Sequence, residues 1–200
     1  MSKHIMLDLE TLGTDPYSVI LSIGAVHFDP GSPGIFRDSF EVLIDPKTSM
    51  AAGLRVDPDT LFWWWDTDRD AARRYYMERL KFELPLALQG FSDWLGWVSQ
   101  DPSPDPEKPN PEVLIWGNGA NFDNVLLANA YKAARMDVPW KFYQDRCFRT
   151  IKGLDPLGKL KPKGVLPGVP EGIAHTALAD AFYQAAWMQN ICDHLKLEVK

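Results

Sequence analysis

The stretch IMLDLETLGT at residues 5–14 decides the fold, because it sets two acids into an apolar run. Successive side chains of a β-strand point to opposite faces, so Asp8 and Glu10 share one face and the flanking leucines share the other. Two carboxylates about 7 Å apart on a buried strand repel each other and lose hydration. The pair indicates either a cation-binding site or a strand at the sheet surface whose polar residues face water.

The composition is that of one globular domain covering residues 1–200. The chain is 46% apolar and 24% charged, and it contains no internal repeat that would indicate a solenoid. Its formal charge of −6 argues against a protein that binds polyanions by bulk electrostatics. A nuclease remains compatible with that charge, since acids that surround divalent cations count as negative when the cations are left out.

The sequence also predicts where the protein works. The two cysteines, Cys147 and Cys192, stand far apart, and the N-terminus has no export signal. No apolar run approaches the roughly 20 residues that span a bilayer. We therefore expect a soluble, cytoplasmic protein with reduced thiols and no membrane partner.

Hydrophobic periodicity predicts an α/β chain. Three strands before residue 45 form an antiparallel meander, and a further strand comes after residue 112. Helix signals begin at Asp57 and recur along the chain, ending in one long helix that carries an apolar stripe. Irregular loops rich in proline or glycine are expected near 101–112 and 153–173. The predicted strands are 5–12, 19–28, 36–44 and 113–116, and the predicted helices are 57–65, 71–81, 84–98, 124–135 and 176–195.

Two segments have an open role. Trp63, Trp64 and Trp65 cannot share one helix face, so at least one of them should be partly exposed. Either all three still serve the core, or one stacks on a nucleic-acid base. The loop at 153–173 is rich in lysine, and it is either a solvated loop or a cationic flap over a nucleic-acid strand.

Asp123 follows the predicted strand 113–116 through a glycine-containing turn and opens the next helix. Open α/β sheets place their sites at such carboxyl ends of strands, which favours a functional acid. An acid in the first helical turn also stabilises the helix dipole. A plain capping role for Asp123 therefore stays open.

Three motifs in order resemble the DEDD exonucleases in the subclass with a catalytic histidine, known from proofreading and RNA-trimming enzymes. The first is LETLG at residues 9–13, directly after Asp8, the second is Phe122-Asp123, and the third is HTALADA at residues 175–181. The resemblance covers nearly the whole chain. It implies a ribonuclease H-like α/β fold, with a mixed sheet flanked by helices.

The resemblance also implies a catalytic set and two bound Mg²⁺ or Mn²⁺ ions. In that set Asp8 bridges the ions, Glu10 and Asp180 bind the ion on the nucleophile side, Asp123 binds the other, and His175 is the general base. Two hard divalent ions about 3.5–4 Å apart can stabilise both an attacking hydroxide and a departing alkoxide, and they take oxygen ligands. A histidine with an ordinary pKa of about 6.5 suits a base that works near neutral pH.

The substrate implied by the resemblance is a single-stranded 3′ end of DNA or RNA, from which nucleoside 5′-monophosphates are released. Thr11 and Leu12 are expected to meet the terminal nucleotide, with Leu12 as a wedge against its base. Asn118 and Phe122 are the other substrate-binding candidates. The alternative is an inactive module that holds nucleic-acid ends on the same fold, although such a module would be expected to lack an acid or the histidine.

One departure narrows the resemblance. Proofreading members read His-Asn-Ala-x-Phe-Asp in the second motif, whereas this chain reads NGANFD at residues 118–123. Together with Trp63-Trp64 and Arg149-Thr150, this looks more like a branch of phage exonuclease A proteins and small bacterial exoribonucleases. That branch contains enzymes that act on DNA and enzymes that act on RNA, so the preference for deoxyribose or ribose stays open. Some related RNA-trimming enzymes form dimers, and we therefore expect that this protein can form a homodimer.

Overall fold

The computed structural model describes residues 2–100, 112–164 and 175–199. Its centre is a mixed sheet of five strands in the order β3-β2-β1-β4-β5. The predicted loop near 101–112 lies outside the described residues apart from its last position, and so does the part of the second loop from 165 to 173. The strands are β1 Lys3–Thr11, β2 Ile20–Phe28, β3 Phe36–Leu43, β4 Val113–Gly117 and β5 Asp145–Cys147.

The register places β1 at the middle of the sheet. β1 pairs antiparallel with β2, where Asp8 lies opposite Gly24, and β2 pairs antiparallel with β3. On its other side β1 runs parallel to β4, which in turn runs parallel to β5. The predicted meander of three early strands and the mixed sheet are therefore confirmed.

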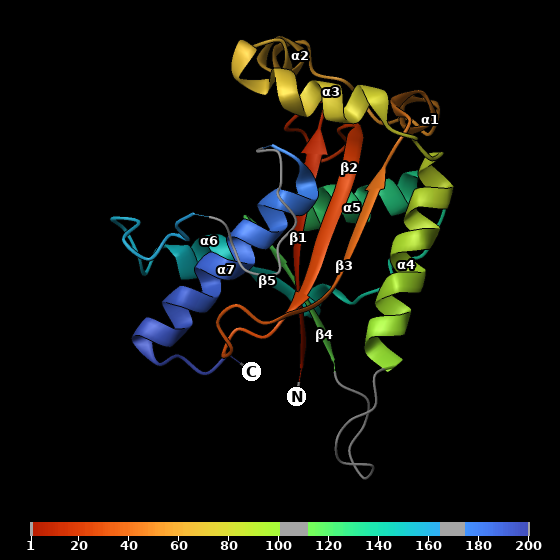
Figure 1. The fold of residues 1–200 in the computed structure, drawn as a ribbon. Coiled ribbons are helices and arrows are strands. Elements are labelled where there is room, and N and C mark those ends of the chain that lie inside the picture. The colour runs from red at the N-terminus through yellow and green to blue at the C-terminus, as the bar shows by residue number, and fades with distance from the viewer. Residues whose placement is uncertain (1, 101–111, 165–174, 200) are drawn as a thin grey trace.

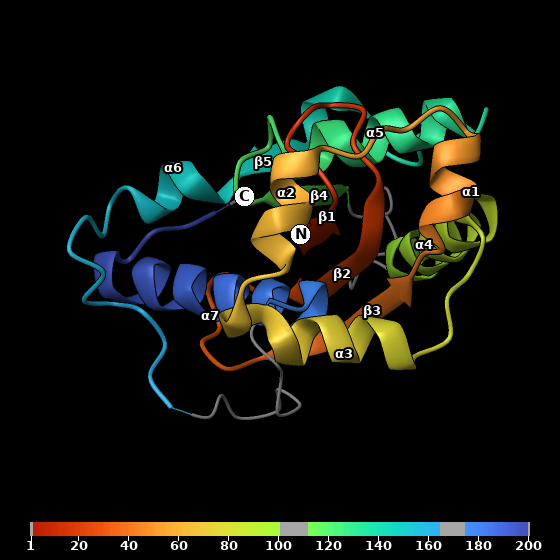
Figure 2. The same cartoon turned by 90° about the horizontal axis from the view of Figure 1, so that it is seen from above.

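Helices cover both faces of this sheet. Figure 1 shows α7 crossing in front of the sheet and α5 behind it, and the view from above in Figure 2 separates the same two layers. The short helices α2 and α3 lie across the end of the sheet at which β1 ends. The helices are α1 Pro46–Ala51, α2 Pro58–Trp64, η1 Thr67–Arg69, α3 Asp70–Glu78, α4 Leu84–Gln100, α5 Asp123–Ala133, η2 Phe142–Gln144, α6 Phe148–Lys152 and α7 Ala177–Leu195.

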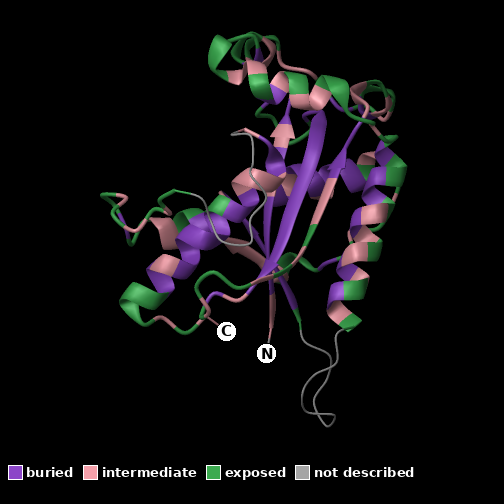
Figure 3. Ribbon diagram, in the orientation of Figure 1, coloured by how far each residue is buried: buried purple, intermediate pink, exposed green. Residues whose placement is uncertain are grey.

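The alternation of β1 divides the core into two clusters. Ile5, Leu7 and Leu9 pack with α4 and α5 on one face, whereas Met6 packs with α6 and α7 on the other. β2 is buried along its whole length (Figure 3). Since Asp8 continues the Met6 side of the strand, the acids of β1 point toward the layer that contains α7.

The predicted helices are present, with small shifts at their ends. The start signal at Asp57 is a true cap, because its side chain accepts a hydrogen bond from the Asp59 backbone N–H at 3.0 Å. The pattern did not predict α1, and it left residues 145–150 unassigned where β5 and α6 lie. Within the described part of the chain, no helix has the length and apolarity needed to cross a membrane.

Candidate active site

Three carboxylates meet in front of the sheet. One oxygen each from Asp8, Glu10 and Asp180 lies within 4.8 Å of the others. Asp8 and Glu10 come from the same face of β1, and Asp180 comes from the first turn of α7. The structure therefore brings acids that are far apart in the sequence close together, and a divalent cation site requires several such oxygen ligands.

A glycine allows this approach. A Cβ built on Gly24 would stand 2.2 Å from the backbone carbon of Ala177 and from the backbone nitrogen of Leu178. Only a residue without a side chain fits there, so the first turn of α7 can lie directly on β2. Because Gly24 pairs with Asp8 in the sheet, this contact sets the separation between Asp8 and Asp180.

Asp123 lies beside the three acids but outside their 4.8 Å group. It is the first residue of α5, directly after the turn that follows β4, and it is 3% exposed. Backbone N–H groups of Asn118 and Leu9 donate to its carboxylate, and its charge helps to raise the pKa of Asp8. Its position agrees with both the capping role and the functional role that the sequence left open.

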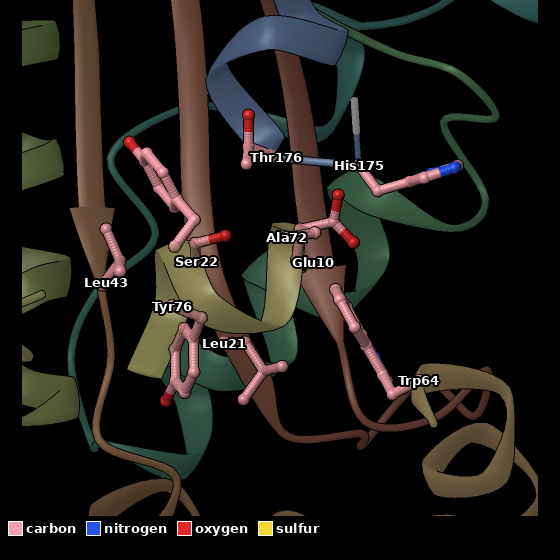
Figure 4. A pocket seen from close by; sticks show the side chains of 10 residues that line it. Glu10, Leu21, Ser22, Leu43, Trp64, Ala72, Tyr76, His175 and Thr176 are labelled. Atoms are coloured by element: carbon pink, nitrogen blue, oxygen red, sulfur yellow. The ribbon is translucent and has the colours of Figure 1, made fainter. Parts of the chain in front are cut away.

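His175 stands at the entrance to α7. Its backbone has φ of +62°, a left-handed conformation that is uncommon for residues other than glycine. Its ring meets the Trp63 ring edge-on, with centroids 5.8 Å apart. Glu10 and His175 line the same narrow crevice, and Figure 4 shows the His175 ring pointing away from the Glu10 carboxylate. The left-handed backbone places His175 two residues before α7, at the edge of the acid cluster.

Burial raises the pKa values of all four acids, and mutual repulsion adds to the rise at Asp8 and Glu10. Burial is the largest cause that raises the pKa of Asp8 well above its ordinary range, followed by the charges of Asp123, Glu10 and Asp180. Burial, with Asp180 and Asp123, raises the pKa of Glu10 to about 8, and burial raises the pKa of Asp123 to about 7. A positive charge among these acids would therefore relieve their repulsion. Their carboxylate oxygens are the ligands that a divalent cation such as Mg²⁺ or Mn²⁺ prefers.

Gln184 is a contact that sequence analysis missed. Its Nε2 donates to Asp8 Oδ1 at 2.7 Å, while its Oε1 is buried without a hydrogen-bond partner among the described residues. Gln184 lies four residues after Asp180, so both project from the same side of α7. The spacing of four residues from Asp180 was the only sequence signal for Gln184. Without the contact to β1, a glutamine at that position is indistinguishable from any other residue inside a helix.

A cavity of about 450 Å³ opens beside the acids, and two of the predicted substrate-binding residues line it. They are Thr11 and Phe122, which lie there with Glu10. Asn118 lies in the turn between β4 and α5, and Leu12 packs against the core cluster. The other lining residues are Leu9, Thr14, Asp57, Asp59, Thr60 and Trp63.

The three tryptophans separate, as their spacing requires. Trp64 is 5% exposed and donates from Nε1 to the backbone oxygen of Thr11 at 2.9 Å. Trp63 is 41% exposed and lines the cavity, and Trp65 is 72% exposed. The interpretation that all three serve the core is therefore wrong, and the prediction that at least one is partly exposed is confirmed.

Residues 3–192 match a family described as the 3′-5′ exoribonuclease Rv2179c-like domain. No curated protein sequence matches the chain. Solved structures are similar in fold. The nuclease domain of 3′hExo, a DEDDh family member bound to rAMP, has 14% identity and a TM-score of 0.58, with 100% of this chain and 96% of that one covered.

Two further solved structures share the fold. The cell-death related nuclease CRN-4 has 13% identity and a TM-score of 0.59, over 97% of this chain. This chain spans 64% of the CRN-4 chain. A full-length 3′-exonuclease has 14% identity and a TM-score of 0.53, over 96% of this chain and 82% of that one. The mixed sheet with its helices is therefore the ribonuclease H-like fold of DEDDh exonucleases, as expected.

Proposed function

This chain belongs to the family of 3′-5′ exoribonuclease Rv2179c-like domains, and from that premise we propose that it removes nucleotides one at a time from single-stranded RNA 3′ ends. The products would be nucleoside 5′-monophosphates, and residues 1–200 would act as one domain. The observation that carries the proposal is the group of oxygens from Asp8, Glu10 and Asp180 within 4.8 Å of one another. It is the oxygen-rich site that metal-dependent phosphodiester hydrolysis needs.

The carboxylates would hold two divalent cations. Asp8, Glu10 and Asp180 would bind one Mg²⁺ or Mn²⁺, and Asp8 with Asp123 would bind the second. Such a pair supplies an activated water and stabilises the leaving oxygen. The raised pKa values of these acids support the assignment, since bound cations would replace the protons that they otherwise keep.

His175 would act as the general base. His175 lines the same crevice as Glu10, and its imidazole, once turned toward the acids, would take a proton from the attacking water, whose oxygen then bonds to phosphorus. The bond from phosphorus to the 3′-oxygen of the preceding nucleotide breaks, and that oxygen takes up a proton from solvent water as it leaves. The backbone of Thr11, which Trp64 fixes, would position the terminal nucleotide for this attack.

The cavity beside the acids would hold the terminal nucleotide. Trp63 and Phe122 offer aromatic surface for its base. Leu12, which follows Thr11 and is partly buried against the core cluster, would act as the wedge. Asn118, in the turn before Asp123, would also contact the substrate. The nuclease domain of 3′hExo, which shares the fold, was solved with rAMP bound, and this supports a nucleoside monophosphate as the product.

A labelled-strand assay tests the proposal. RNA and DNA oligomers carrying a 5′ label are incubated with Mg²⁺ or Mn²⁺, and the products are separated by length. We expect a ladder that shortens from the 3′ end of RNA and is lost in Asp8→Asn. Retention of an uncut strand would indicate the inactive binding module instead, and a faster ladder on DNA would overturn the sugar assignment. Sedimentation of the same sample tests the expected homodimer.

A further inference from the structure

A second cavity, of about 410 Å³, lies between α6 and α7. Its charged lining consists of Arg149, Lys152 and Lys161 together with a single acid, Asp155. Three cations and one carboxylate give this cavity a net charge of +2, in a chain whose formal charge is −6. The cavity is therefore positively charged, whereas the protein as a whole is negatively charged.

The Asp155 carboxylate accepts three hydrogen bonds from neighbouring residues. It accepts hydrogen bonds from the backbone N–H groups of Lys159 and Leu160 and from Trp187 Nε1, each at 2.9 Å. These bonds fix the turn after α6 and hold the indole in place. The Asp155 carboxylate is thus part of the cavity wall, where its oxygens are occupied by hydrogen bonds from the turn and from Trp187.

Two ammonium groups share the Trp187 ring. Lys152 Nζ lies 5.1 Å and Lys161 Nζ 5.2 Å from its centroid, and neither makes a salt bridge with another described residue. Gly158 in this turn has φ of +62°, a left-handed conformation that favours glycine. Both lysines line the cavity, so a polyoxygen anion bound there would gain from two positive charges.

Arg149 connects this cavity with the candidate active site. Its Nη2 donates to the backbone oxygen of Asn118 at 2.8 Å, in the turn that leads to Asp123. Arg149 and Lys152 are three residues apart on α6 and so project from the same side of it. Figures 1 and 2 show α6 beside α7 and away from α2. The hydrogen bond from Arg149 to the turn before Asp123 links this cavity to the acids.

We propose that the cavity formed by Arg149, Lys152 and Lys161 binds a backbone phosphate of the strand whose 3′ end occupies the active site. The proposal rests on the proposed exonuclease function and adds the contact that holds the strand upstream of the bond to be cut. Lysine and arginine are the usual partners of phosphate oxygens. The cavity would make the enzyme favour strands long enough to reach it.

Two substrates separate this contact from the chemistry. An RNA strand of about eight nucleotides carries upstream phosphates, whereas the p-nitrophenyl ester of a nucleoside 5′-monophosphate contains the phosphodiester to be cut and no upstream phosphate. For the double variant Lys152→Gln/Lys161→Gln, the ratio of kcat/KM on RNA to kcat/KM on the ester should fall about 5- to 10-fold. The slope of log KM against log salt should also flatten by about 0.7 for each phosphate that the variant no longer neutralises.

Matched variants complete the test. Lys47→Gln/Lys132→Gln removes the same charge from exposed positions on α1 and α5 and should leave the ratio unchanged. Lys152→Arg/Lys161→Arg should keep most of the ratio, because the charge is retained. An unchanged ratio in the first variant, or an equal fall in the Lys47 and Lys132 control, overturns the phosphate contact. Wild-type protein that cleaves neither substrate would instead overturn the proposed function.

Discussion

Gly24 of β2 lies directly beneath Ala177 of α7, so close that a Cβ on the glycine would stand 2.2 Å from the Ala177 backbone carbon. That contact involves backbone rather than a flexible side chain, so it cannot be relieved by a rotamer change. Any side chain at position 24 must lift the start of α7, and His175 and Asp180 move with it.

We therefore expect Gly24→Ala to lower kcat about 100-fold or more and to destabilise the fold by about 1–3 kcal/mol, the usual cost of overpacking. Gly96→Ala is the control, since a Cβ there meets nothing within 4 Å and a helix favours alanine. Turnover of labelled RNA and chemical denaturation measure the two effects. Normal activity in Gly24→Ala would contradict the positioning role of this contact.

Gln184→Leu should weaken metal binding about 10- to 100-fold, the usual cost of losing a partner that orients a metal ligand. The reason is that its Nε2 holds Asp8 Oδ1 at 2.7 Å. Titration of Mn²⁺ against activity gives the apparent affinity. Gln89→Leu, an exposed change on α4, should leave that affinity unaltered.

His175→Ala should reduce kcat about 100-fold or more while metal affinity is largely kept, because a general base acts on the water and not on the ions. His194→Ala, near the other end of α7, is the matched control and should retain full turnover. If both variants turned over at the wild-type rate, His175 would have no catalytic role.

Trp63→Ala should raise KM for RNA at least 5-fold, since stacking on an aromatic ring is worth about 1–3 kcal/mol per base. It should also lower kcat, because the Trp63 ring supports His175 edge-on. Trp65→Ala removes a neighbouring indole that is 72% exposed and should change neither constant. Steady-state kinetics on one oligomer measures all of these values, and equal effects from both tryptophans would disprove base stacking at Trp63.

Without divalent cations the protein should become less stable as pH rises from 6.5 to 8. Glu10 and Asp123 have pKa values raised to about 8 and about 7 in the fold, against 4.5 and 3.8 ordinarily. In this window the folded state binds more protons than the unfolded chain, so stability is lost as pH rises through the raised pKa values. Buried His4, whose pKa burial lowers to about 4 from 6.5, opposes this trend weakly, because the unfolded histidine gives up its remaining protons between pH 6.5 and about 7.5.

Thermal unfolding in a chelating buffer at pH 6.5 and pH 8 measures this loss. Each kcal/mol corresponds to about 2–4 °C in a chain of this size. Mn²⁺ should restore more stability at pH 8 than at pH 6.5, and Glu10→Gln should flatten the dependence. A melting temperature that rises between these pH values without metal would refute the explanation.

Sequence pattern predicted most of the fold because its signals are local. The period of two in residues 5–11 placed Asp8 and Glu10 on one face, and Asp57-Pro58 marked a helix start that the structure confirms. β5 has three residues and α1 has six, too few for a period to appear. The family motifs predicted the acids that lie together, Asp8, Glu10 and Asp180.

The remaining features of the site depend on contacts between distant segments. Gln184 and Asp8 are 176 residues apart, and the approach of α7 to Gly24 exists only once the sheet and the helix are packed. The separation of the three tryptophans was likewise predicted only in part, because helical spacing says that they diverge but not which one faces the cavity. Such features require coordinates.

The position of β1 and α7 at opposite ends of the sequence has a consequence for biosynthesis. A ribosome releases the strand with Asp8 and Glu10 early, but Asp180 and Gln184 emerge only with the last helix. A nascent chain that lacks α7 has no means of completing the acid cluster. The complete acid cluster would thus form only after α7 has left the ribosome, and termination before residue 180 would yield a chain without Asp180 and Gln184.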